Sequence, residues 1–110
     1  MNNLNNSFQG IFPILSTPSD KNGNIVFEDL RKEVEWMIQN GVNGVGIAIA
    51  SEIYKYSEKE RDEILSTVVD QVNGRVIVVM NTGGESTDLS IHYSKKAIEL
   101  GADALMIRPA

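Results

Sequence analysis

The sequence predicts an α/β protein made of consecutive βαβ units around a parallel sheet. Short apolar runs alternate with segments of helical period, and the predicted strands start about thirty residues apart. The units also resemble one another, because residues 40–45 at the second strand match residues 100–105 at the fourth. Repetition of this kind favours a barrel or a solenoid of βα units over an irregular α/β domain.

The first part of the chain predicts a tail, a strand and a helix. Residues 1–9 are rich in asparagine and predict a flexible tail ahead of one domain over residues 10–110. The apolar run at 10–17 predicts the first strand, and a turn follows at 22–24. The next segment has apolar residues at helical spacing and a C-terminal cap signal: Leu30, Val34, Met37, Ile38 and Asn40-Gly41.

The middle of the chain repeats this plan. Residues 44–50 predict a second strand, which is apolar and without charge until Ser51-Glu52. A capping-box pattern at 57–60 then starts the second helix, which closes at Asn73-Gly74. Its apolar stripe consists of Ile64, Leu65, Val68, Val69 and Val72.

The last part adds two strands and one helix. Residues 75–81 are rich in β-branched residues and predict the third strand. The loop 82–88 ends in an N-cap, and a helical stripe then runs to Gly101. Residues 103–107 predict the fourth strand. Crossovers wound in one direction would place all three helices on one side of this sheet and leave the other side bare. We therefore expect the chain to be a piece of a larger barrel or to complete itself by association.

Composition excludes several classes of partner. Hydrophobic residues make up 42% of the 110 residues, and the net charge is −5. Acidic and basic residues alternate along the predicted helix faces, so the chain has no basic stripe that would bind nucleic acid or anionic lipid. No segment approaches the ~20 apolar residues of a membrane span, and the N-terminus lacks the features of a secretory signal. We expect a cytoplasmic protein that acts on a small molecule.

Cysteine is absent and His92 is the single histidine. We therefore expect no metal site and no cofactor. His92 falls on the helix face opposite Leu89 and Tyr93, where we expect it to be solvated. Lys95 and Lys96 lie on the same helix, where they would stay protonated and be poor nucleophiles.

Polar residues at the ends of the predicted strands are the candidate site. Ser51-Glu52 would bind a carboxylate or handle protons, or it is a polar strand end that caps nearby N–H groups. Thr17-Pro18 would form the floor of a pocket, or it only terminates the first strand. The loop 82–86 would hold an anion, or it is an ordinary loop before an N-cap. Tyr54 and Tyr56 would line a mouth or a contact between subunits, or they anchor a surface loop.

Six short motifs, in order and at the right spacing, resemble the N-terminal part of the dihydrodipicolinate synthase and N-acetylneuraminate lyase family. They are GIFPILSTP at 10–18, NGNIVF at 22–27, GVNG at 41–44, SEKER at 57–61, TGGEST at 82–87 and GAD at 101–103. The resemblance covers nearly the whole chain from Gly10 but well under half of a family member. It implies that the chain is the N-terminal part, about four strands and three helices, of a (β/α)₈ TIM barrel that forms homo-oligomers.

The resemblance implies a class I aldolase or lyase, in which a lysine forms a Schiff base with pyruvate or another 2-oxo acid. In the family this lysine lies on strand six and the relay tyrosine on strand five, so both are expected beyond Ala110. No catalytic residue is therefore expected within this chain, and the isolated chain is expected to be inactive.

The loop after the second strand is the part of the family's site that this chain would contain. The family's usual Gly-Thr-Thr-Gly-Glu is replaced by residues 48–52, AIASE, so that only Ser51 offers a hydroxyl. The resemblance implies that substrate binds at Ala50, Ser51, Glu52 and Thr17. Loss of the threonine pair argues against dihydrodipicolinate synthase activity itself and points to a divergent branch with a different substrate or none. Two non-enzymatic alternatives stay open: a half-barrel that self-associates as a binding or assembly module, and an anion-binding module that uses Gly83-Gly84.

Overall fold

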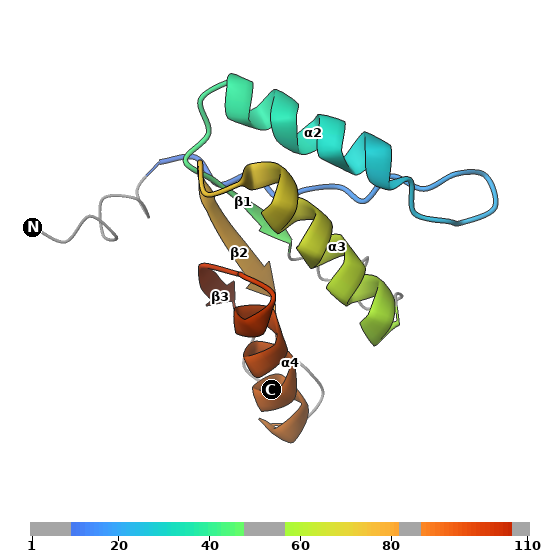
Figure 1. Ribbon diagram of the computed structural model, residues 1–110, viewed down its shortest axis with the longest axis vertical. Coiled ribbons are helices and arrows are strands. Elements are labelled where there is room, and N and C mark those ends of the chain that lie inside the picture. The colour runs from blue at the N-terminus through green and yellow to red at the C-terminus, as the bar shows by residue number, and fades with distance from the viewer. Residues whose placement is uncertain (1–9, 48–56, 82–86, 107–110) are drawn as a thin grey trace, which may run out of the picture.

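The computed structural model describes residues 10–47, 57–81 and 87–106 (Figure 1). Helices and strands alternate along them as α2 (Phe27–Gln39), β1 (Gly44–Ile47), α3 (Glu58–Val72), β2 (Ile77–Asn81), α4 (Thr87–Glu99) and β3 (Ala104–Met106). This confirms the predicted alternation. The expected tail, and the ends of the second and fourth predicted strands, lie outside the described residues.

The strands form one parallel sheet in the order β1-β2-β3. Its register pairs Gly46 with Val79, and Val79 with Ala104. The helices lie side by side in chain order, with α3 packed between α2 and α4 (Figure 1). Neighbouring parallel strands joined through one helix each, wound in one direction, are the repeating arrangement of a βα barrel.

The first predicted strand, over residues 10–17, is wrong as a strand. The structure has a single parallel bridge there, between Ile14 and Gly46. Gly46 donates its N–H to the Pro13 carbonyl at 2.9 Å, and Leu15 donates its N–H to the Gly46 carbonyl at 2.8 Å. The preceding pair of this ladder would need an N–H from residue 13, which proline lacks. The segment therefore lies beside β1 without a regular ladder.

Local sequence signals explain the helix ends. Ser57 Oγ accepts the Glu60 N–H at 3.2 Å while Glu60 Oε1 accepts the Ser57 N–H at 3.0 Å, which confirms the capping box at the start of α3. The same helix ends at Asn73, whose φ of 49° is left-handed. α4 begins at Thr87, so Asp88 lies in its first turn and is not its N-cap. None of the helices described is long and apolar enough to cross a bilayer.

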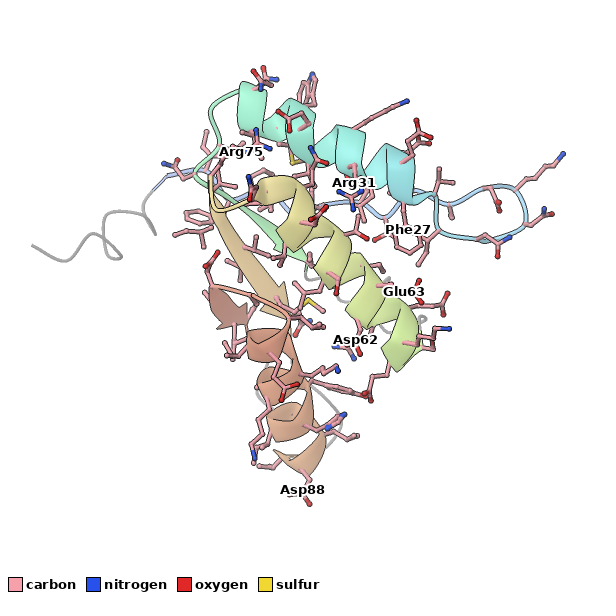
Figure 2. The ribbon with its side chains drawn as sticks, in the orientation of Figure 1. Phe27, Arg31, Asp62, Glu63, Arg75 and Asp88 are labelled. Atoms are coloured by element: carbon pink, nitrogen blue, oxygen red, sulfur yellow. The ribbon has the colours of Figure 1, made fainter. Side chains whose placement is uncertain are left out.

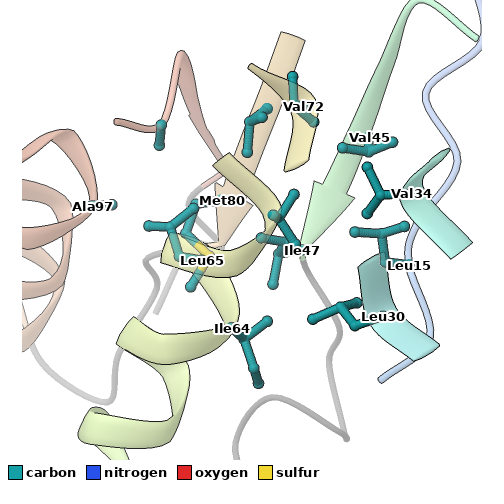
Figure 3. Packing of buried hydrophobic residues seen from close by; sticks show 13 residues of the cluster. Leu15, Leu30, Val34, Val45, Ile47, Ile64, Leu65, Val72, Met80 and Ala97 are labelled. Atoms are coloured by element: carbon teal, nitrogen blue, oxygen red, sulfur yellow. The ribbon is translucent and has the colours of Figure 1, made fainter. Parts of the chain in front are cut away.

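The hydrophobic core lies between the helices and one face of the sheet (Figure 3). Side chains from α2, α3, β1 and β2 are its most deeply buried members, each at most 1% exposed: Leu30, Val34, Val45, Ile64, Leu65, Val68 and Val78. The α3 residues occur at helical spacing, and the strand residues alternate along each strand, so both patterns direct their apolar side chains to the same layer.

The alternate strand residues lie on the opposite face, which we call the open face. They are Gly44, Gly46, Ile77, Val79, Asn81, Ala104 and Met106. Ile14, Gly46, Val79 and Ala104 form one row across this face, because each pairs with the next. The predicted placement of all helices on one side is thus confirmed for the residues that the structure describes.

The same two-bond clamp precedes β1 and β3. Asn43 donates its N–H to the Ile11 carbonyl at 2.9 Å, and its Oδ1 accepts the Ile11 N–H at 3.0 Å. Asp103 donates its N–H to the Val78 carbonyl at 2.9 Å, and its Oδ2 accepts the Val78 N–H at 2.9 Å. Asn43 and Asp103 occupy equivalent positions in the predicted repeat, so the repeat has a structural basis.

Ion pairs on the outer surface join the helices. Arg31 Nη1 of α2 lies 2.7 Å from Asp70 Oδ2 of α3, and Arg75 contacts both carboxylate oxygens of Glu35 at 3.0 and 2.7 Å (Figure 2). The Arg75 guanidinium, helped by two glutamine amides, lowers the pKa of Glu35 from its ordinary 4.5 to about 2. Exposed pairs of this kind contribute little stability each and mainly fix the orientation of α2 on α3.

Candidate functional site

The open face carries an apolar hollow of about 300 Å³. Its lining comes from the N-terminal segment and all three strands: Phe12, Ile14, Gly46, Val79, Ala104, Leu105 and Met106. The β1 glycines leave room for two of these side chains. A Cβ on Gly44 would lie 2.5 Å from the Phe12 ring, and one on Gly46 would lie 2.7 Å from Ile14 Cδ1. Apolar hollows with a few polar groups at their edge are the usual form of a small-molecule site.

Asn81 supplies a polar group at the C-terminal edge of this face. It is the last residue of β2, it is 1% exposed, and its register partner is Met106 of β3. It shares the open face with Val79, because side chains two positions apart on a strand lie on the same side. In βα barrels, substrate-contacting residues come from this end of the strands.

Arg61 of α3 holds the backbone of Asn81. Its Nη2 donates to the Asn81 carbonyl at 3.2 Å, and its guanidinium carbon lies 4.2 Å from the centre of the Tyr93 ring of α4. Arg61 is only 6% exposed. A buried guanidinium must be satisfied by hydrogen bonds or an aromatic face, and here both are present. This contact ties the end of β2 to both neighbouring helices.

The seam between α3 and α4 is polar but closely packed. Its hollow measures only about 10 Å³ and is lined by side chains from both helices and β2: Glu58, Arg61, Asp62, Met80, Tyr93, Lys96 and Ala97. Figure 2 shows Asp62 on the side of α3 that faces α4. Burial raises the pKa of Asp62 above its ordinary value. The seam has no room for a substrate and joins the two helices.

His92 is partly, not fully, solvated. Its side chain is 54% exposed, and its Nε2 lies 2.9 Å from Glu58 Oε2 of the neighbouring helix. The prediction of a solvated histidine therefore missed a partner that comes from another βα unit. Across the described ranges, no group of three or more His, Cys, Asp or Glu side chains is placed to hold a metal ion.

Thr17 is the one predicted substrate-binding residue within the described ranges. It is half-buried and follows Ser16, whose N–H and hydroxyl both donate to Glu33 Oε2, at 3.3 and 2.7 Å. Glu33 Oε1 is buried and has no hydrogen-bond partner among the described residues. Glu33 thus fixes the chain immediately before Thr17.

The other predicted site residues lie outside the described residues. They are Ala50, Ser51 and Glu52 of the expected substrate loop, Tyr54 and Tyr56 beside it, and Gly83 and Gly84 of the expected anion loop. Their grouping with Thr17 remains a prediction.

Arg61 and Asn81 were missed from the sequence, although each had a signal. Arg61 stands three residues before Ile64 and four before Leu65, at the helical spacing of the buried stripe of α3. Asn81 keeps the two-residue alternation of β2 after Ile77 and Val79. A charged or amide residue in phase with an apolar pattern is the informative exception.

The model of the dihydrodipicolinate synthetase family matches residues 7–109. A 4-hydroxy-tetrahydrodipicolinate synthase of Methanococcus vannielii is 39% identical over 100 residues, which are 90% of this chain and 34% of that protein. The chain therefore spans about a third of the length of the curated relatives that it matches.

Solved structures agree with this match. The dihydrodipicolinate synthase of Bacillus clausii superposes with a TM-score of 0.87 at 31% identity, over 94% of this chain and 36% of that one. The chloride-inhibited enzyme of Acinetobacter baumannii, in complex with pyruvate, gives a TM-score of 0.87 at 31% identity, over 90% of this chain and 34% of that one. These neighbours are TIM barrels, and the chain corresponds to their N-terminal part.

Proposed function

The chain belongs to the dihydrodipicolinate synthetase family, and from this we propose that it forms the first part of a pyruvate-dependent Schiff-base aldolase or lyase. The observation that carries the proposal is the family match over residues 7–109. The pyruvate complex of the Acinetobacter baumannii relative supports a 2-oxo acid as the substrate class.

The open face supports the same proposal. In the barrel arrangement this face forms part of the inner wall, and its strands run toward the end where barrel enzymes bind substrate. We propose that Thr17, Ala50, Ser51 and Glu52 contact the 2-oxo acid there. Asn81 lies at the same end of the sheet and adds a buried amide.

The proposed chemistry needs a lysine, which we propose lies outside this part of the barrel. Its neutral amine would attack the ketone carbonyl and release water to form an imine, and loss of a C3 proton would give an enamine that adds to an aldehyde. The described lysines are poor candidates because they lie on helices or turns at the surface, away from the open face. We propose that the lysine and a relay tyrosine lie on later strands, and that the 110 residues alone are inactive.

Borohydride trapping tests this proposal. The full-length protein carrying these residues and the separate 110-residue chain are each incubated with pyruvate, reduced and weighed by mass spectrometry. We expect one reduced pyruvyl group on the full-length protein and none on the separate chain. An adduct on the separate chain would refute its inactivity, and no adduct on either would refute the proposed function.

A second candidate function is self-association through the open face. Ile14 is 45% exposed and Met106 41% exposed beside the hollow, and apolar patches on a surface mark contact sites. Expressed separately, the chain would then bury this face against a second copy and act as a binding or assembly module. Light scattering after size exclusion tests this candidate, because a monomer at all concentrations would exclude it.

A further inference from the structure

Asn81 differs from every other described strand residue on its side of the sheet. The others on the open face are glycine, alanine or larger apolar residues: Gly44, Gly46, Ile77, Val79, Ala104 and Met106. A buried carboxamide costs free energy unless its polar atoms are paired, so a position of this kind is informative. Asn81 is the last residue of β2, two positions after Val79 and paired with Met106, which both line the hollow.

The backbone of Asn81 is fixed from the opposite side of the sheet. Arg61 donates to its carbonyl at 3.2 Å, and the Tyr93 ring stacks on the guanidinium at 4.2 Å. A planar guanidinium with several donors holds a carbonyl more rigidly than a lysine would. The side chain of Asn81 is therefore presented on the open face from an anchored strand end.

We propose that Asn81 is a specificity-determining residue of the 2-oxo acid site, and that Arg61 is the positioning residue that holds it. This inference rests on the proposed function and deepens it. A carboxamide has two N–H donors and an oxygen with two lone pairs, so a partner within the protein leaves capacity for a ligand. Its N–H groups suit a carboxylate, whereas an aspartate at the same place would repel one.

The test compares Asn81→Asp with wild type in the full-length protein, using pyruvate and its uncharged methyl ester. The substitution keeps the shape of the side chain and adds a negative charge. We expect the KM for pyruvate to rise about ten- to a hundredfold, as for a lost hydrogen bond to a charged group, while the KM for methyl pyruvate changes less than about threefold. A merely structural role of Asn81 would affect both substrates alike.

A matched control is Asn43→Asp, which makes the same charge change at the opposite end of the sheet. Its Oδ1 only accepts a hydrogen bond from Ile11 N–H, and a carboxylate keeps that bond. We expect this variant to use both substrates as wild type does. Asn81→Ser, which keeps a donor without adding charge, serves where the aspartate variant fails to fold, and we expect its KM for pyruvate to rise less than about tenfold.

The role of Arg61 is tested with Arg61→Lys, which keeps the charge but loses the planar donor set. Because Arg61 acts through Asn81, we expect this substitution to raise the KM for pyruvate more than the KM for the methyl ester, with kcat less affected, whereas a merely structural role of Arg61 would raise both KM values alike. If Asn81→Asp had the same KM values as wild type for pyruvate and for methyl pyruvate, the inference would be overturned while the proposed function stayed intact. Wild-type protein that traps no pyruvate would overturn both.

Discussion

The two faces of the sheet are built by different rules. On the covered face, Val45 and Val78 are at most 1% exposed because large side chains of α2 and α3 pack on them. On the open face, β1 has only Gly44 and Gly46, and side chains of the N-terminal segment fill the space above them. The comparison teaches that large side chains of two helices stabilise the covered face, whereas the open face has only a thin cover from the N-terminal segment. The backbone hydrogen bonds between the strands lie in the plane of the sheet and serve both faces.

The largest expected effect comes from the covered face. Leu65→Ala removes a side chain that is 1% exposed in the middle of α3, and we expect it to lower the free energy of unfolding by about 2–5 kcal/mol. Urea denaturation measures this loss. Val79→Ala on the open face is the comparison. If it lowered the free energy of unfolding as much as Leu65→Ala does, the proposed difference in packing between the two faces would be contradicted.

The clamp before β3 tests the hydrogen bonds that join the strands and serve both faces alike. Asp103→Ala would leave the Val78 N–H without the acceptor that now lies at 2.9 Å, at an expected cost of about 1–3 kcal/mol. Asp103→Asn keeps an acceptor oxygen, as Asn43 does in the equivalent clamp, and should cost less. Thermal unfolding of the two variants measures the difference. Equal loss in both variants would show that the charge matters and not the acceptor.

The two glycines of β1 test how tightly the N-terminal segment packs on the open face. A Cβ at residue 44 would lie 2.6 Å or less from two atoms of the Phe12 ring and 2.7 Å from the Ile77 carbonyl, whereas one at residue 46 meets mainly the flexible end of Ile14, at 2.7 Å. We expect Gly44→Ala to cost about 1–3 kcal/mol and Gly46→Ala less than about 1 kcal/mol. Urea midpoints measured side by side distinguish them. The reverse order would mean that Phe12 yields and Ile14 does not.

The smallest effect belongs to the surface pair of Glu35 and Arg75, which touches neither face. The pKa of Glu35 is lowered from 4.5 to about 2, so its contribution to stability is complete above the unfolded value and is lost as the pH falls toward the folded one. We expect Arg75→Ala to lower the melting temperature slightly at pH 7, where the contribution is complete, and to leave it nearly unchanged near pH 2, where the wild type has lost the contribution too. A melting temperature that falls equally at both ends would indicate lost packing.

Much of the fold could be predicted because its signals are local. The capping box at Ser57 and Glu60, the left-handed Asn73 and the helical stripe of α3 depend only on nearby residues. Pro13 was visible too, but its effect depends on which carbonyls β1 offers, and that register is a property of the sheet. The first predicted strand was therefore shortened to one bridge.

The candidate site was harder to predict, for a related reason. Asn81 is a candidate site residue because of the sheet face on which it lies and because Arg61, twenty residues earlier in the chain, binds its carbonyl. His92 likewise takes its partner, Glu58, from another unit. Contacts between units follow from the packing of helices on the sheet, and no single stretch of sequence encodes them. The family resemblance implies a substrate class, and both that class and the substrate-binding residues remain predictions.

The clamps at Asn43 and Asp103 fix the alignment of β1 and β3 at the N-terminal end of each strand, away from the end where a substrate would bind. Each clamp aligns an incoming strand with its neighbour before the strand begins, so the alignment does not depend on the residues beyond the strand's other end. Sequence change after β1 or β2, where a substrate would bind, can then accumulate without shifting the strands.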